Sequence, residues 1–314
     1  MHEVLKLIES EALRAGPIDP DLPFAWQRER LDAATLFANE RRPEIVSVSD
    51  LWVPARGRRV QCRHYRPSPD KRLPAVVFFH GGGWVRSSVE THDRLAREIA
   101  LAARVAVISV DYALSPEARF PQALEECADV THWLRLNGAG LGIDPDRLAV
   151  AGDSAGGNLA LGVALFLRDR GEAFLNAIAA FYPVCDFDLS TASYREFAEG
   201  CFLTRDLMRG FWEAYAPGQA LRHHPYAAPL RADLSGLPPT LVQLAELDVL
   251  FSEGQALAAK LKAAGVDATC EIYRGMAHGF MRHTGRVATA RGAMARLGEW
   301  LEHDRLRLKR IRHL

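Results

Sequence analysis

The segment LAVAGDSAGGNLALGVAL (residues 148–165) places a serine where an apolar strand would end and a helix would begin. Gly152 and Gly156 stand two residues on either side of Ser154. This spacing is typical of a nucleophile elbow, a strained strand-to-helix turn that presents a serine hydroxyl at the edge of a sheet. The glycines have a steric reason, because side chains at both positions would collide in so tight a turn. An ordinary glycine-rich turn with a serine cap is the alternative interpretation.

A serine hydroxyl is a weak nucleophile, so it needs a base, typically a histidine held by a carboxylate. Such triads often run serine, acid, histidine along a chain of this pattern. His278 directly follows a predicted strand, in the glycine-flanked loop YRGMAHGF (273–280), and His283 is its nearest rival. Asp248 falls in the loop after the preceding strand, with Glu246 as second choice for the acid. A helix N-terminal charge is the alternative role for either carboxylate.

Three consecutive glycines follow another apolar run in VVFFHGGGW (76–84). Acyl transfer places negative charge on the former carbonyl oxygen, and backbone N–H groups that face this oxygen stabilise it. One donor is expected from Ala155, the residue after the serine, and the others from this glycine loop. A phosphate cradle is the rival function, but the loop lacks the Lys-Ser/Thr of a P-loop and the spacing of a dinucleotide fingerprint. We expect His80 to hold the shape of the loop and not to act as a base.

Short apolar runs separated by helical segments must position these residues. Two alternating stretches, 44–54 and 58–67, predict an antiparallel strand pair with a turn at Arg56-Gly57. Nearly continuous apolar runs predict parallel strands covered on both faces, at 75–79, 105–110, 147–152, 177–182 and 240–246, with a further strand at 267–273. Helices are expected at 91–103, 121–136, 155–170, 252–264 and 287–303. This alternation predicts an α/β fold with a mostly parallel sheet.

One long excursion interrupts the alternation between Tyr182 and Thr240. Its residues 193–217 are expected to be helical and carry many large apolar side chains. Long excursions between the strands of a sheet are usually functional. We therefore expect residues 1–42 and 188–231 to form a helical cap, and residues 43–187 and 232–314 to form the catalytic domain.

Composition excludes several classes of protein. Thirty-nine basic residues balance 39 acidic ones, whereas a nucleic-acid-binding protein usually has a basic excess. The five cysteines contain no CxxC pair, which argues against a disulfide framework or a zinc site. No stretch approaches the about 18 apolar residues of a membrane span, and the N-terminus does not resemble a signal peptide. A cytoplasmic protein without stable membrane insertion is expected.

The basic C-terminus, residues 304–314, is expected to be a solvated helix end whose charges suit the helix dipole. Its alternative role is a contact with a membrane surface or with a second copy, in a homodimer.

Six segments together resemble the bacterial hormone-sensitive-lipase-like (family IV) carboxylesterases of the α/β-hydrolase superfamily, of the GDSAG type. They are HGGGW (80–84), DYALSPEARFPQALEE (111–126), GDSAGGNLA (152–160), YPVCD (182–186), ELDVLFSEG (246–254) and MAHGF (276–280). They occur in the family's order and span most of the chain from about residue 44.

The resemblance implies an α/β-hydrolase fold with a mostly parallel eight-stranded sheet, helices on both faces and a helical cap. It implies an enzyme without cofactor or metal that acts on small-molecule esters. Its motifs place the nucleophile at Ser154, the acid at Asp248 and the base at His278. The implied oxyanion donors are Gly82, Gly83 and Ala155, with Gly81 as a further candidate.

The sequence departs from the family pattern near the acid. Asp248-Val249-Leu250 replaces the usual Asp-Pro-Leu, and Ser252 stands where the family usually has a second aspartate. Ala113 replaces a usual arginine, and Glu117 is interpreted as structural. These departures leave the expected triad residues unchanged but alter the surroundings of the acid.

The expected reaction is hydrolysis of short- to medium-chain acyl esters through an acyl-enzyme intermediate. Alternatives are an amide or carbamate hydrolase with the same triad, and a non-catalytic small-molecule receptor of the same fold. Candidate pocket residues are apolar side chains near the glycine loop and the cap, for which packing in the core or cap is the alternative role. They are Phe24, Trp26, Trp84, Phe202, Leu203, Phe211 and Trp212.

Overall fold

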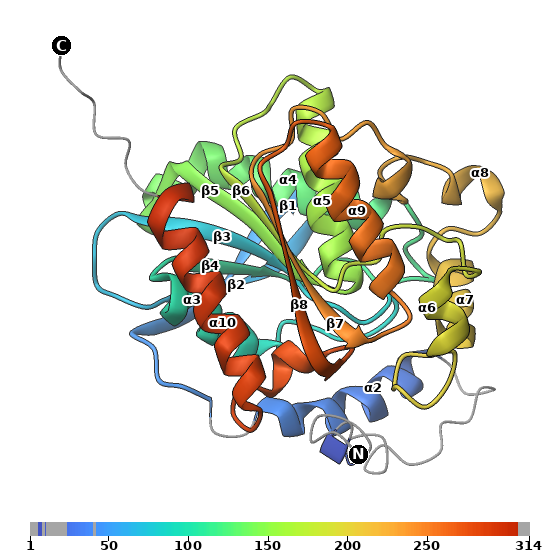
Figure 1. Ribbon diagram of the computed structural model, residues 1–314. Helices are drawn as coiled ribbons and strands as arrows, with labels where there is room; N and C mark the ends of the chain where they lie inside the picture. Colours follow the sequence, from blue (N-terminus) through green and yellow to red (C-terminus); the bar gives the residue numbers. More distant parts are fainter. Residues whose placement is uncertain (1–5, 8–9, 11–23, 40–41, 307–314) are drawn as a thin grey trace.

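The computed structural model describes residues 6–7, 10, 24–39 and 42–306. Most of the predicted N-terminal helical pieces, and residues 307–314 of the basic C-terminus, therefore lie outside the described residues. The described part forms an eight-stranded sheet in the order β1-β2-β4-β3-β5-β6-β7-β8 (Figure 1). The strands are β1 (Ser47–Ala55), β2 (Arg58–Arg66), β3 (Leu73–Phe79), β4 (Ala106–Val110), β5 (Ile143–Asp153), β6 (Ala177–Phe181), β7 (Thr240–Leu247) and β8 (Ala268–Ala277).

The sheet is mostly parallel, as the continuous apolar runs predict. β1 and β2 pair antiparallel, β2 pairs antiparallel with β4, and every later pair is parallel. Arg56 and Gly57 both have positive φ in the turn between β1 and β2, which suits a tight hairpin. The carboxyl ends of β3, β5, β6, β7 and β8 consequently lie along one edge of the sheet.

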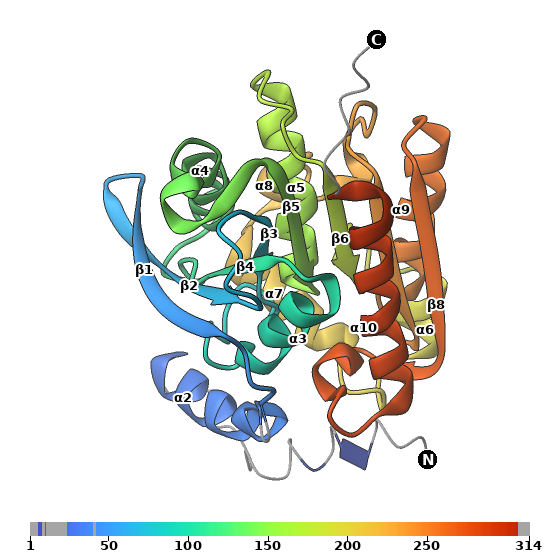
Figure 2. The same cartoon turned by 90° about the vertical axis from the view of Figure 1, so that its left-hand side faces the viewer.

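Helices cover both faces of the sheet (Figures 1 and 2). One face packs on α3 (Asp93–Ala103) and α10 (Ala288–Trp300), which also contact each other. The other face packs on α4 (Gln122–Asn137), α5 (Ala155–Asp169) and α9 (Phe251–Ala263). These two buried layers confirm the predicted α/β architecture, because strands covered on both faces can be apolar along their whole length.

Shorter helical elements complete the described chain. They are α2 (Phe24–Thr35), η1 (Leu36–Asn39), η2 (Gly138–Leu141), α6 (Ala192–Glu196), α7 (Arg205–Tyr215), α8 (Gln219–Arg222), η3 (Pro229–Arg231), η4 (Phe280–His283) and η5 (Leu301–Arg305).

Several boundaries differ from the sequence prediction, and two of the differences have a clear structural reason. β8 continues to Ala277 instead of ending at 273, because its pairing with β7 resumes beyond a register shift at Leu247 and Ala277. The expected helix over 193–217 is two helices, α6 and α7, separated by a non-helical stretch. Gly200 in that stretch has φ of 81°, and Thr204 restarts the helix by accepting a hydrogen bond from the Leu207 N–H.

Of the segments 24–39 and 188–231, the first contains α2, which lies on the side of the molecule toward which β7 and β8 run (Figure 1). The second contains α6, α7 and α8, which lie along the right-hand side of that view. Arg28 of α2 donates to the Val85 and Ser115 carbonyl oxygens, at 2.5 and 2.6 Å. It also pairs with Glu117 at 2.6 Å, the structural role expected for that residue. From the other segment, Ala227 accepts a hydrogen bond from the buried Asn158 amide of α5. Both segments are thus anchored to the loops and helices that surround Ser154.

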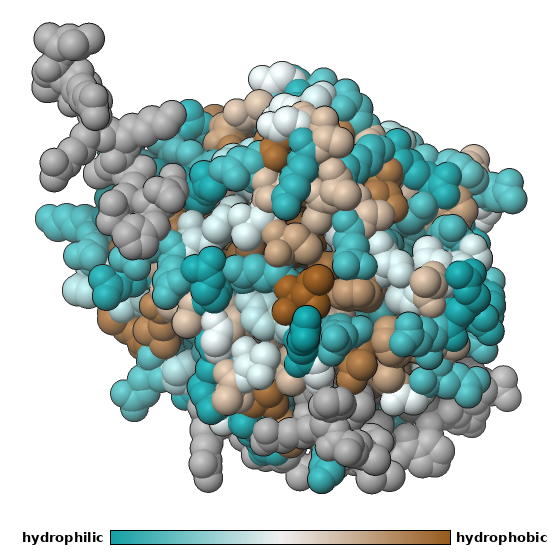
Figure 3. Space-filling model, in the orientation of Figure 1, coloured by the Kyte–Doolittle hydropathy of each residue, from teal (hydrophilic) through white to brown (hydrophobic). Residues whose placement is uncertain are grey.

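The outer surface in the view of Figure 1 carries hydrophobic residues in small groups among hydrophilic ones (Figure 3). Singly scattered apolar residues are normal on protein surfaces and need no partner to explain them. Within the described ranges, no helix has the length and apolar character that a bilayer crossing requires.

Candidate active site

Ser154 occupies a strained turn between β5, which ends at Asp153, and α5, which begins at Ala155. Its backbone has φ 57° and ψ −120°, a conformation that non-glycine residues rarely adopt and that is often found at functional sites. A Cβ on Gly156 would overlap the Phe79 carbonyl oxygen, and one on Gly152 would overlap the Gly156 backbone. The glycines are therefore required by close backbone contact, as the sequence pattern predicts.

A continuous chain of hydrogen bonds joins three residues from the ends of three different strands. The Ser154 Oγ lies 2.9 Å from His278 Nε2, and His278 Nδ1 lies 2.7 Å from Asp248 Oδ2. The other Asp248 oxygen, Oδ1, accepts from the Leu250 N–H at 3.0 Å. All three residues are buried, and Ser154 retains 7% exposure. A buried carboxylate in this position can orient the imidazole and stabilise its charged form.

The rival acid and base are engaged elsewhere. Glu246 Oε2 accepts a hydrogen bond from the Gly275 N–H at 2.8 Å, so this carboxylate supports the bend of β8 before His278. His283 lies in η4, and burial lowers its pKa to about 3. The chain of hydrogen bonds that begins at Ser154 therefore contains His278 and Asp248, and neither rival.

The glycine loop lies beside Ser154, and its backbone is suited to presenting N–H groups. Gly82 and Gly83 have φ of 118° and 62°, values that favour glycine. Among the hydrogen bonds of the described residues, none uses the N–H of Gly82, Gly83 or Ala155 as donor. Gly81 differs, because its N–H donates to Asp153 Oδ1 at 2.9 Å. The expectation of a Gly81 donor is therefore corrected: this N–H already has a protein acceptor.

Asp153 is a supporting residue that the sequence reasoning did not single out. Besides accepting from Gly81, its carboxylate lies 3.4 Å from His92 Nε2. Burial alone would raise the pKa of Asp153, but His92 and the Gly81 N–H hold it below its usual range. A carboxylate at the end of an apolar strand, directly before the serine, was the available signal. Asp153 couples the elbow to the glycine loop.

His80 plays the structural role that was expected. It is fully buried, its Nδ1 lies 2.8 Å from the Gly81 carbonyl oxygen, and its ring stacks on Tyr112. Burial lowers its pKa to about 3, so the ring is neutral at ordinary pH. The Tyr112 hydroxyl in turn donates to the His80 carbonyl oxygen at 2.7 Å.

The aromatic ring of Tyr182 is a second contribution that the sequence reasoning missed. It lies beside the His278 imidazole, with 4.8 Å between the ring centroids. Tyr182 follows β6 and has φ of 36°. Tyr182 begins the YPVCD segment, but the sequence does not indicate which loop side chains meet.

The predicted pocket residues divide into three groups. Trp84 and Trp212 are buried in one cluster, where Trp84 stacks on Tyr215 at 4.2 Å. Other rings cover these two side chains, which favours the packing role that was their alternative, while the place of the 4% exposed Leu203 in the pocket stays a prediction. The large rings of the tryptophans fill the space between the glycine loop and α7.

Phe202 and Phe211 are half-buried and border the proposed site. A Cβ on Gly83 would overlap the Phe211 ring, and Phe202 lies near Gly279, next to His278. Trp26 is 61% exposed and so does not share the buried cluster. The side chain of Phe24 lies outside the described residues.

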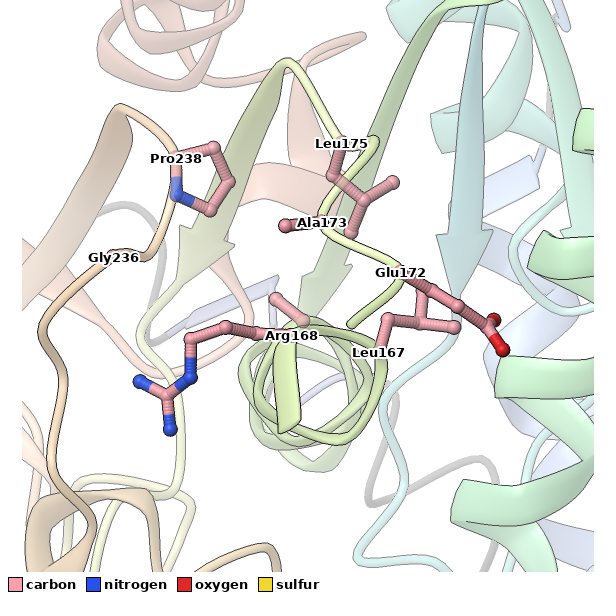
Figure 4. A pocket seen from close by; sticks show the side chains of 8 residues that line it. Leu167, Arg168, Glu172, Ala173, Leu175, Gly236 and Pro238 are labelled. Carbon is pink, nitrogen blue, oxygen red and sulfur yellow. The ribbon is translucent and has the colours of Figure 1, made fainter. Parts of the chain in front are cut away.

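A cavity of about 80 Å³ lies elsewhere, at the far end of α5 (Figure 4). Leu167 and Arg168 line it, about 20 Å along the helix from Ser154 at 1.5 Å per residue. It does not belong to the Ser154 site. Within the described ranges, no cluster of three His, Cys, Asp or Glu side chains has the arrangement of a metal site.

Comparison with known proteins identifies the family. A family model described as the alpha/beta hydrolase fold matches residues 76–282, a range that contains Ser154, Asp248 and His278. The chain belongs to this α/β-hydrolase family, in its hormone-sensitive-lipase-like branch.

The relatives of this α/β-hydrolase include named esterases. It is 39% identical over 237 residues to the carboxylesterase NlhH of Mycobacterium tuberculosis, covering 74% of each chain. It is 34% identical over 286 residues to the ethyl acetate hydrolase of Pseudomonas putida, covering 88% of this chain and 90% of the relative. A solved esterase from the archaeon Pyrobaculum calidifontis superimposes with a TM-score of 0.89 at 39% identity, covering 95% and 97% of the two chains.

Proposed function

We propose that this serine carboxylesterase hydrolyses short- to medium-chain acyl esters, with Ser154 as nucleophile, His278 as base and Asp248 as its orienting acid. The observation that carries the proposal is the unbroken chain of hydrogen bonds from the Ser154 hydroxyl through His278 to Asp248. This chain of hydrogen bonds begins at a strained elbow, beside backbone N–H groups that donate to no acceptor among the described residues. These are the components that acyl transfer requires.

The reaction has two halves. His278 Nε2 takes the proton of Ser154 Oγ as this oxygen attacks the ester carbonyl carbon. The N–H groups of Gly82, Gly83 and Ala155 stabilise the resulting oxyanion. When the C–O bond to the alcohol breaks, His278 returns the proton to the leaving oxygen. A water molecule, deprotonated by His278, then attacks the acyl carbon. As the bond from this carbon to Ser154 Oγ breaks, His278 returns the proton to Oγ and the acid leaves.

The preference for short to medium acyl chains rests on the residues next to Gly83. The Phe211 ring lies against Gly83, and the guanidinium of Arg86 lies over the same ring at 5.4 Å. A long acyl chain would have to displace these side chains. The relative named ethyl acetate hydrolase supports a small substrate.

We also propose that residues 1–42 and 188–231 form a cap over residues 43–187 and 232–314, which form the catalytic domain. Support comes from the contacts of Arg28 with Val85 and Ser115. The second supporting contact is the packing of Phe211 on the glycine loop. In this arrangement the cap supplies part of the substrate pocket.

The principal test is Ser154→Ala, measured with 4-nitrophenyl esters of two to sixteen carbons. We expect kcat to fall by a factor of about 10⁴ or more, and wild-type kcat/KM to be highest for acyl chains of eight carbons or fewer. An organophosphate should label Ser154 in the wild type and leave the variant unlabelled. Full activity in Ser154→Ala would refute the nucleophile, and a preference for sixteen carbons would refute only the chain-length proposal.

A further inference from the structure

Two serines from different segments form a reciprocal hydrogen-bonded pair beside residues 248–250. These residues link β7 to α9 and include Asp248, and we call them the acid loop. Ser193 lies in α6, within residues 188–231, and Ser252 lies in the first turn of α9. The Ser193 N–H donates to Ser252 Oγ at 3.1 Å, and the Ser252 N–H donates to Ser193 Oγ at 3.1 Å. Each serine therefore satisfies a backbone donor of the other. We call these two residues the serine pair.

The serine pair also binds the loop that carries Asp248. The Ser193 hydroxyl donates to the Val249 carbonyl oxygen at 2.6 Å, and Ser193 is only 2% exposed. The same peptide unit donates its N–H, that of Leu250, to Asp248 Oδ1, while Asp248 Oδ2 faces His278. The peptide between Val249 and Leu250 thus accepts the Ser193 hydrogen bond with its carbonyl oxygen and orients the Asp248 carboxylate with its N–H group.

This turn needs such a restraint. Val249 does not fix its own φ as a proline would. Hydrogen bonds must therefore hold the turn from Asp248 to Leu250 in place. Within the turn, the Phe251 N–H donates a hydrogen bond to the Asp248 carbonyl oxygen at 3.1 Å. The Ser193 bond ties the same turn to a separate segment of the chain. A shift of α6 would therefore be transmitted to the Asp248 carboxylate.

We propose that Ser193 and Ser252 are positioning residues that hold the catalytic acid in contact with His278. The inference rests on the proposed function of Asp248 and His278. Neither serine touches the Ser154 hydroxyl, so their effect passes through the acid loop. Small displacements of catalytic groups have large effects on rate, up to about 10²-fold for 1 Å.

The experiment compares Ser252→Ala, Ser193→Ala and the double variant, with 4-nitrophenyl butyrate as substrate. We expect each single variant to lower kcat about 5- to 20-fold with KM changed less than about twofold, because substrate contacts are untouched. The double variant should resemble the worse single variant, since each serine depends on the other. Ser252→Thr keeps the hydroxyl and should therefore retain most of the wild-type kcat.

Ser190→Ala is the matched control. Ser190 lies in the same segment and is exposed, and its hydroxyl binds Asp188 instead of the acid loop. This variant should keep kcat within about twofold of the wild type. Thermal unfolding of every variant, with kcat measured well below each Tm, separates loss of folded protein from loss of rate.

The decisive arm repeats Ser252→Ala in an Asp248→Asn background. If the pair acts through the acid, the second substitution should change the residual kcat less than about twofold. The same 5- to 20-fold loss in both backgrounds, or a lowered Tm with unchanged kcat, would overturn the positioning role. An Asp248→Asn enzyme with full activity would instead refute the proposed function itself, so the two failures are distinguishable.

Discussion

The two sides of the Ser154 site are held by different physical means. On the serine side, backbone meets backbone: Gly156 lies against the Phe79 carbonyl, and Gly152 lies against the Gly156 backbone. On the acid side, hydrogen bonds from side chains hold the structure, because Ser193 and Ser252 bind each other and Ser193 binds the loop next to Asp248.

The difference teaches how each side should respond to change. Close backbone contact leaves no room for an added methyl group, since a clash with main chain cannot be relieved by a rotamer change. Hydrogen bonds from side chains can be removed one at a time, with about 1 kcal/mol or somewhat more lost for each. We therefore expect abrupt losses of function on the serine side and gradual losses on the acid side.

Gly156→Ala should have the largest effect. The added Cβ would overlap the Phe79 carbonyl oxygen, so β3 and α5 would have to separate at the elbow. We expect kcat/KM to fall by a factor of about 10³ or more and stability to fall by about 3 kcal/mol, measured by urea unfolding. Gly292→Ala is the control, because nothing lies within 4 Å of its added Cβ. Equal behaviour of the two variants would contradict the steric account.

Asp153→Ala should have the next largest effect. It leaves the buried Gly81 N–H without its acceptor, at a cost of about 1–3 kcal/mol, and frees the glycine loop to shift. We expect kcat to fall about 10- to 100-fold. Asp153→Asn keeps an acceptor for Gly81 and should lose less than about fivefold. If Asp153→Asn were as impaired as Asp153→Ala, charge and not loop position would be the cause.

The same residue gives a pH prediction. The pKa of Asp153 in the folded protein is below its ordinary value of 3.8. Its ionised form therefore adds stability above that value, and the contribution is lost as pH falls through the lower folded pKa. Urea unfolding between pH 6 and 3 should show a shallower loss of stability for Asp153→Asn than for the wild type. Parallel curves would contradict the lowered pKa.

Glu253→Gln, on the acid side, should have the smallest effect. Burial raises the pKa of Glu253 well above its ordinary 4.5, although its carboxyl accepts from the Cys185 N–H at 2.7 Å. The folded protein thus keeps a proton that the unfolded chain loses above pH 4.5, so stability declines as pH rises toward the folded pKa. Glutamine removes this decline while keeping an acceptor. We expect kcat within about twofold, and stability relative to the wild type that improves from pH 5 to pH 8.

A constant difference in stability across that pH range would contradict a protonated Glu253. Glu253→Ala serves as comparison, since it removes the acceptor of the Cys185 N–H and should lose stability at both pH values. The measurement is urea unfolding of the three proteins at several pH values.

Much of the fold was predictable because its signals are local. Apolar runs such as 75–79 and 105–110 identified buried parallel strands, and the glycines around Ser154 identified the turn between β5 and α5. The broken helix between α6 and α7 was not predicted, because the apolar periodicity of 193–217 continues across Gly200. Trp84 and Trp212 were assigned to the pocket because a sequence shows that a side chain is apolar but not whether another ring already covers it.

The sequence by itself determined the order of the strands along the chain, the turn that carries Ser154, and the loops in which Asp248 and His278 lie. These features depend on residues that are neighbours in the chain, where glycine, strand and helix preferences act. Only the tertiary structure decided that the Gly81 N–H is taken by Asp153, and that Ser193 binds the Asp248 loop. Both contacts join residues 56 or more positions apart, and such pairings depend on how the sheet and its covering segment pack together.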